Sequence, residues 1–103
     1  MATFELLIKN GTILDGVAGQ AYQADVGIAG QEIKALGKLG AARARETILA
    51  DTKYVAPGFI DIQNHSDSYF TILEIPAQDS LLTQGITTIA VGHCGTSLAP
   101  LSH

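Results

Sequence analysis

Two apolar runs that each end in polar, metal-capable side chains constrain the fold of this chain most strongly. Residues 59–62, Phe-Ile-Asp-Ile, lead into Gln63 and His65, and residues 86–91, Ile-Thr-Thr-Ile-Ala-Val, lead to Cys94. Nearly continuous runs of apolar and β-branched residues are typical of strands whose two faces are both covered. The sequence therefore predicts two buried strands with candidate ligands at their carboxyl ends.

A short helix is expected between these two strands, over residues 77–83. Pro76 suits the start of a helix, and Gly85 suits the position that follows a helix end. A strand, a helix and a second strand make a βαβ unit, and such units build parallel sheets. Because ligands bind at the carboxyl ends of parallel strands, we expect His65 and Cys94 to lie at one edge of such a sheet.

The first half of the chain has a different pattern, made of short strands and turns. A hairpin turn is expected at Asn10-Gly11 and a second one around Gly30, within a series of strands at residues 4–8, 12–14, 24–30, 32–37 and 46–50. Strands this short and regular indicate a small sandwich sheet. Residues 37–44 are expected to form a surface connection or a brief helix.

The pattern changes near Ala56, and we place a domain boundary there. Residues 1–56 are expected to be an all-β segment, and residues 57–103 the start of an α/β segment. No internal repeat or low-complexity tract interrupts either part.

Composition narrows the possible partners and compartments. Hydrophobic residues make up 47% of the 103 residues and charged residues 16%, which excludes a disordered chain. Ten acidic against six basic residues, without a basic cluster, argue against a nucleic-acid partner. The absence of an apolar run of about 20 residues argues against a membrane span. The N-terminus lacks the features of a signal peptide, and a single cysteine cannot form an internal disulfide, so a reducing cytoplasm is expected.

The candidate ligands each have a plain alternative. Cys94 is either a buried small hydrophobe or a metal ligand, and the adjacent Gly92 and Gly95 would let a ligand approach closely. His65 is either a loop histidine bonded to nearby backbone or a ligand. Asp67 is either a carboxylate that bonds and orients a metal-binding imidazole or the cap of a turn.

Gln63 stands two residues before His65, so on an extended strand both side chains would point to the same side. An amide oxygen is a poor zinc ligand, and Gln63 is either a weak second-metal ligand or an ordinary hydrogen-bonding residue. Strand alternation would direct His93 away from Cys94, and we interpret His93 as structural. Asp61 shares the face of Gln63, and nothing is argued from His103.

The chain resembles the opening of amidohydrolase-superfamily enzymes over essentially all of its length. The resemblance is carried by residues 6–16, 24–37 and 55–67, in that order and spacing. Residues 81–100, with Gly-His-Cys-Gly followed by Ser-Leu-Ala-Pro, resemble the D-aminoacylase branch, the N-acyl-D-amino-acid deacylases. That resemblance implies a zinc hydrolase in which a β-sandwich, built from both chain termini, stands beside a (β/α)8 TIM barrel.

The resemblance also implies roles for individual residues. Cys94 matches the cysteine that binds zinc after the second barrel strand, and His65 matches the second histidine of a His-x-His pair on the first strand. Gln63 replaces the first histidine of that pair, and His93 replaces the asparagine of the usual Asn-Cys-Gly. In this branch the tightly bound zinc depends on the cysteine and on two later histidines, and the first-strand pair serves a weaker second position. The Gln63 replacement therefore affects the second metal position.

A barrel of this type needs roughly 250 residues, so we expect this chain to be an N-terminal fragment that holds no catalytic residue and is inactive alone. The function implied is zinc-dependent hydrolysis of the amide bond of N-acyl-D-amino acids, with a small-molecule substrate. The alternatives are a cyclic-amide hydrolase of the hydantoinase or dihydroorotase type, a metal-free non-catalytic homologue, and a self-sufficient small domain. Specificity, metal number and oligomeric state stay open.

Overall fold

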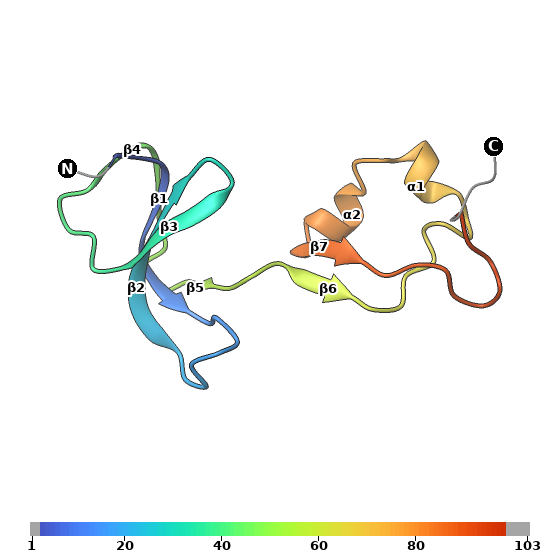
Figure 1. Ribbon diagram of the computed structural model, residues 1–103, viewed down its shortest axis with the longest axis horizontal. Helices are drawn as coiled ribbons and strands as arrows, with labels where there is room; N and C mark the ends of the chain where they lie inside the picture. Colours follow the sequence, from blue (N-terminus) through green and yellow to red (C-terminus); the bar gives the residue numbers. More distant parts are fainter. Residues whose placement is uncertain (1–2, 99–103) are drawn as a thin grey trace. The chain divides into compact units, whose positions relative to one another are not determined.

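The computed structural model describes residues 3–98 (Figure 1). The chain divides between Pro57 and Gly58 into two compact units, which are described separately below. Ala99 and Pro100, which end the second resemblance motif, and His103 lie outside the described residues.

The first unit is a sheet of five strands in the order β3-β2-β1-β4, with β5 also pairing with β1. The strands are β1 (Thr3–Ile13), β2 (Tyr22–Ala29), β3 (Glu32–Gly37), β4 (Arg43–Leu49) and β5 (Tyr54–Val55). β2 is antiparallel to both β1 and β3, whereas β4 and β5 run parallel to β1. The hairpin expected around Gly30 is confirmed, and so is the strand expected at 46–50, although β4 begins earlier. Residues 38–42 contain no helix.

The hairpin expected at Asn10-Gly11 is wrong, because β1 continues through both residues. Asn10 adopts a left-handed conformation with φ of 60°, and the pairing of β1 with β2 shifts register between Ile8 and Gly11. Asparagine tolerates this conformation, so the pair makes a bulge instead of a turn. A Cβ on Gly11 would lie 2.6 Å from Cγ2 of Val55, so glycine also lets β5 approach β1.

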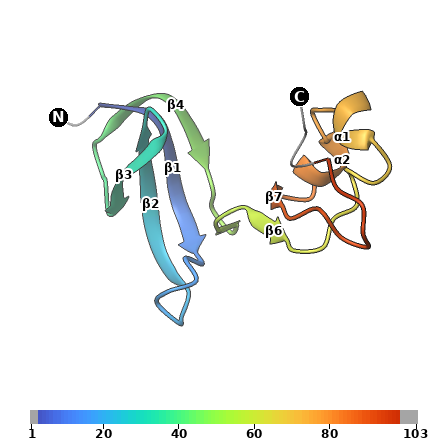
Figure 2. The same ribbon diagram turned by 45° about the vertical axis from the view of Figure 1, so that its right-hand side comes forward.

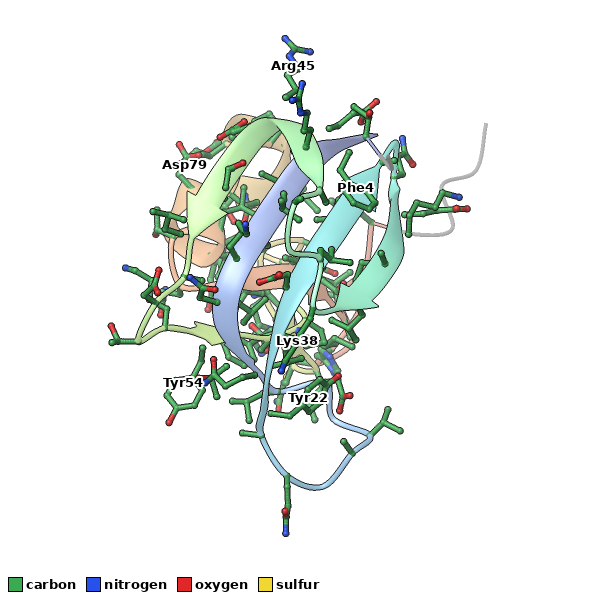
Figure 3. The ribbon with its side chains drawn as sticks, turned by 90° about the vertical axis from the view of Figure 1, so that its left-hand side faces the viewer. Phe4, Tyr22, Lys38, Arg45, Tyr54 and Asp79 are labelled. Carbon is green, nitrogen blue, oxygen red and sulfur yellow. The ribbon has the colours of Figure 1, made fainter. Side chains whose placement is uncertain are left out.

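The core of the first unit contains a cluster on β1 and β2. The buried members of this cluster are Ile13, Ala24 and Val26, and Tyr22 and Val55 are among the partly buried side chains that pack on them. Leu7, with 1% of its surface exposed, is the most buried apolar side chain of the unit. At the other end of β1 the ring of Phe4, labelled in Figure 3, packs so closely over Gly27 that a Cβ there would lie 2.7 Å from it. Arg45 and Tyr54, also labelled there, are exposed.

The second unit is a parallel pair of strands with two short helices. β6 (Phe59–Asp61) pairs with β7 (Ile86–Ile89), and α1 (Thr71–Glu74) and α2 (Asp79–Leu82) lie between them in the sequence. Figures 1 and 2 show α2 beside β7. The expected βαβ unit is confirmed, with a helix shorter than predicted, and α1 was not predicted.

The two strands of this unit are not buried on both faces as expected. Phe59 is 62% exposed and Ile60 64% exposed. Two strands and two single-turn helices do not have enough surface to cover both faces of β6. Among residues 3–98, the structure has no helix that is both long and apolar enough to span a bilayer.

Asp25 is the buried carboxylate that joins the bulge to the β3–β4 connection. Its exposed fraction is 8%, and its two oxygens accept hydrogen bonds from the N–H of Asn10 at 2.9 Å and of Leu39 at 3.0 Å. The Asn10 bond is the main cause that lowers the pKa of Asp25, and burial opposes it.

Asp25→Asn is expected to loosen the first unit, because one backbone N–H would face an amide donor instead of a carboxylate oxygen. Losing such a bond costs about 1–3 kcal/mol, so exchange of the β1 and β2 amides should speed up about tenfold or more. Hydrogen exchange followed by NMR measures this effect. Asp51→Asn is the matched control, since Asp51 is exposed and its carboxylate accepts a hydrogen bond from the Asn10 side-chain amide, not from a backbone N–H of the described residues. Equal protection in both variants would contradict the role given to Asp25.

The same carboxylate should make the first unit sensitive to acid. Because the folded pKa of Asp25 lies below its usual value of about 3.9, its contribution to stability is present above that pH. The contribution is lost as the pH falls through the lower folded value. Far-UV circular dichroism against pH should therefore show an acid transition that Asp25→Asn weakens. An unchanged transition in that variant would contradict this assignment.

Candidate metal centre

Asp61, the last residue of β6, stabilises the turn that ends this strand. Asp61 accepts the backbone N–H of Gln63 through Oδ1 at 3.1 Å and the side-chain amide of Asn64 through Oδ2 at 2.8 Å. A side chain that captures the N–H two residues on competes with the strand ladder. The expectation that Gln63 and His65 lie on one extended strand is therefore wrong, and Gln63 is exposed in a bend.

The loop that carries His65 is bonded to the segment that follows β7. The N–H of Ala90 donates to the carbonyl of Asp61 at 2.8 Å, and the N–H of Asn64 donates to the carbonyl of Ala90 at 3.0 Å. Asn64 is buried, and its side-chain oxygen accepts the N–H of Ser66 at 2.9 Å. These bonds bring the segments that contain His65 and residues 90–94 together beyond the ends of the two strands.

Asp67 joins the same two segments. Its side chain is 1% exposed, with Oδ1 accepting the N–H of Ser68 and Oδ2 accepting the N–H of Gly92, both at 2.9 Å. A buried carboxylate is tolerated because it accepts such bonds. Asp67 therefore fixes Gly92 against the first loop, and a contact from Asp67 to an imidazole stays a prediction.

The rings of His65 and His93 lie against each other. Their centroids are 6.0 Å apart, with the planes at 66° in an edge-to-face arrangement. Strand alternation does not apply to His93, because β7 ends at Ile89 and residues 90–93 have no regular structure. The basis for treating His93 as structural is therefore wrong. Nε2 of His93 is buried and has no hydrogen-bond partner among residues 3–98.

Sequence reasoning missed His93 because it assumed a strand that extends to Cys94. A signal was present, since a histidine between Gly92 and Cys94 stands in a glycine-rich segment that is ill suited to a strand. The φ values of Gly92, Cys94 and Gly95 are 88°, 57° and 76°, all left-handed, and they give this segment its turns.

Cys94 is free and exposed in the described structure, and its role as a metal ligand stays a prediction. Its thiol and the imidazoles of His65 and His93 come from the carboxyl ends of two adjacent parallel strands, as expected for His65 and Cys94.

The electrostatics of the two loops involve both histidines. The pKa of Asp61 is lowered, first by the bond from the Asn64 amide and then by the bond from the Gln63 N–H, with smaller contributions from the charges of His65 and His93.

The donor types match zinc, but the described residues supply only part of a zinc site. Imidazole nitrogen and thiolate sulfur are the ligands that zinc prefers, and a complete site takes three or four protein ligands. Within residues 3–98 no group of three or more His, Cys, Asp or Glu side chains is arranged to hold one metal ion. Further ligands would have to come from beyond the described residues.

The curated relatives include N-acyl-D-amino-acid deacylases and, over a smaller share of this chain, adenine deaminases. No family model matches the chain. An N-acyl-D-glutamate deacylase of Alcaligenes xylosoxydans xylosoxydans is 45% identical over 96 residues, which are 93% of this chain and 19% of that protein. The chain thus spans about a fifth of the length of this relative.

Two solved structures match with high similarity. One is an N-acyl-D-glutamate deacylase from Bordetella bronchiseptica, complexed with zinc and a phosphonate inhibitor that mimics the tetrahedral intermediate. It is 41% identical, with a TM-score of 0.87 over 96% of this chain and 20% of that one. The other is a D-aminoacylase studied for its binuclear metal centre, which is 42% identical, with a TM-score of 0.84 over 97% of this chain and 21% of that one.

Proposed function

Because this chain is homologous over nearly its whole length to D-aminoacylase-type enzymes of the amidohydrolase superfamily, we propose that it is the N-terminal part of a zinc-dependent hydrolase. The proposed reaction is hydrolysis of the amide bond of N-acyl-D-amino acids. The observation that carries the proposal is the likeness to the Bordetella deacylase, whose structure holds zinc and a mimic of the tetrahedral intermediate.

Cys94 is the residue of this chain that would hold the zinc. Its thiol is exposed beyond the carboxyl end of β7, two residues after Gly92, whose N–H is bonded to the Asp67 carboxylate of the His65 loop. When bound, zinc lowers the pKa of a water ligand to about 7 and polarises a carbonyl group. His65 would line the same site, and Asp67 would keep the loop after β6 bonded to the loop after β7. The remaining ligands and the group that transfers the proton would lie in the rest of the enzyme.

The proposed architecture places the first strands of a composite β-sandwich at residues 1–56 and the start of a (β/α)8 TIM barrel at 57–103. The parallel pairing of β6 with β7 supports the second assignment, since it is the repeating unit of such a barrel. Exposed apolar side chains at Phe59, Ile60 and Ile62 support it too, because neighbouring strands and helices would cover them. The first unit likewise exposes Ile33 and Leu49.

The proposed setting is a reducing cytoplasm with a small acylated amino acid as substrate. An exposed free thiol suits that compartment, because it would be prone to oxidation elsewhere. The experiment below distinguishes this function from two alternatives, a cyclic-amide hydrolase and a metal-free homologue that binds without catalysis.

The full-length protein that carries this chain is expected to contain about one tightly bound zinc ion per chain and to hydrolyse N-acetyl-D-amino acids. Cys94→Ser should lose the zinc and at least about 100-fold in activity, because the thiolate ligand of the zinc that activates water is removed. Elemental analysis and an amine-release assay measure the two effects. Thr96→Ser, a conservative change at an exposed position of the same loop, should alter neither. Absence of metal in the parent would favour the non-catalytic homologue, and turnover of cyclic amides alone would favour the other alternative.

The 103-residue chain by itself is expected to have no deacylase activity and to remain partly unfolded or aggregate. Each large apolar side chain left in water forgoes about 1.5–3 kcal/mol, and a typical domain has a stability of only about 5–15 kcal/mol. Hydrogen exchange should protect the strands of the first unit more than those of the second, which has no buried apolar side chain among its described residues. A soluble monomer with one sharp thermal transition and measurable hydrolysis would contradict both the architecture and the proposed function.

A further inference from the structure

Ser66, the residue after His65, has each of its polar groups hydrogen-bonded. Its N–H donates to the side-chain oxygen of Asn64 at 2.9 Å, and its carbonyl accepts the N–H of Ile72 at 3.1 Å. Its hydroxyl donates to Oε1 of Gln78 at 3.0 Å. The first two partners are close in the sequence, whereas Gln78 is 12 residues away, directly before α2. The loop that carries His65 is therefore bonded to the connection that leads to β7.

The Gln78 side chain uses both ends of its amide. Its Nε2 donates to the carbonyl of Thr71 at 3.0 Å and to the carbonyl of Ile75 at 2.6 Å. Because carbonyl oxygens only accept hydrogen bonds, the amide nitrogen faces α1 and the amide oxygen is left for the Ser66 hydroxyl. The two bonds to α1 are local capping of that helix. The bond to Ser66 extends beyond the helices and has a different consequence.

The backbone of Gln78 has a conformation that glycine would adopt with less strain. Its φ is 49° and its ψ is 42°, in the left-handed region. A residue other than glycine keeps this conformation only where its surroundings fix it, and such residues cluster at functional sites. Glutamine at this position, in place of glycine, therefore indicates that its side-chain bonds are used.

We propose that Gln78 is a positioning residue, which through the Ser66 hydroxyl holds the backbone that directs the His65 imidazole. This proposal rests on the proposed function, because it assigns a residue of the β6–β7 connection to the site that would carry out deacylation. Asn64 and Asp67 bond the His65 loop to the segment after β7, and Gln78 bonds it to the helices. A displacement of a site residue by about 1 Å can lower a reaction rate about 100-fold.

The first test compares two Gln78 variants in the full-length protein. Gln78→Met keeps the length of the side chain but removes all three of its bonds, and Gln78→Gly removes them while permitting the left-handed backbone. Both should lower kcat for an N-acetyl-D-amino acid about tenfold or more, with KM little changed, because the geometry of the reacting centre is altered. Gln84→Met is the matched control, since Gln84 is exposed and its amide donates to the Ser80 carbonyl within the same connection. It should leave both constants unchanged.

Ser66 variants test whether the effect of Gln78 passes through the Ser66 hydroxyl. Ser66→Ala removes this hydroxyl but leaves the N–H and carbonyl bonds of the residue, so it should lower kcat as Gln78→Gly does. The double variant should lose little more than Gln78→Gly alone, because both changes remove the same bond. Ser66→Thr keeps a hydroxyl for Gln78 and should retain most of the activity. Additive losses in the double variant would show that Gln78 acts on α1 alone, and would overturn the proposal.

NMR of the histidine-labelled, full-length protein gives a readout that does not depend on activity. The ring signals of His65 should shift in Gln78→Gly and in Ser66→Ala, and they should stay in place in Gln84→Met. Unchanged His65 signals and unchanged kcat in the Gln78 variants would overturn the proposal. If the Gln78 variants do not fold, Ser66→Ala decides in the same way. A folded parent that hydrolyses no N-acyl-D-amino acid overturns the proposed function instead, and the His65 signals then decide the role of Gln78.

Discussion

The hydrogen bonds of the Asp67 carboxylate underlie the candidate site. One oxygen accepts from the N–H of Ser68 in its own loop, and the other accepts from the N–H of Gly92 in the loop after β7. Because only 1% of the Asp67 surface is exposed, water does not compete for these hydrogen bonds. Since β6 and β7 pair over very few residues, this bond and the Asn64–Ala90 bond determine how the two loops lie beyond the strands.

The sequence predicted the parts of the chain where local pattern and tertiary structure agree. The β2–β3 hairpin around Gly30, the parallel β6–β7 pair and the helix after Pro76 follow from spacing and composition. Asn10-Gly11 was misread because the choice between a turn and a bulge depends on Asp25, which accepts the Asn10 N–H from a strand that comes later in the chain. A hydrogen bond between residues this far apart in the sequence cannot be predicted from the residues around Asn10 alone.

At the candidate site, the sequence predicted where His65 and Cys94 lie along the fold, but not the backbone conformation that sets the direction of the side chains. His65 and Cys94 lie at the carboxyl ends of adjacent strands, as the βαβ pattern implies. The pleat rule that was used to orient Gln63 and His93 requires extended backbone, and the backbone leaves that conformation after Asp61 and after Ile89. Asp61 captures the Gln63 N–H, and the left-handed residues from Gly92 to Gly95 fold the second loop.

The two units differ in the kind of side chain that they bury. The first has a buried cluster that includes Ile13 and Val26, whereas the buried side chains of the second, among the described residues, are Asn64 and Asp67. A unit whose interior is polar depends on hydrogen bonds that hold their strength only when water is excluded. Covering β6 and β7 would therefore strengthen the same bonds that position His65 and His93. Metal binding at these loops and burial of the apolar strands should then be coupled, since each stabilises the arrangement that the other needs.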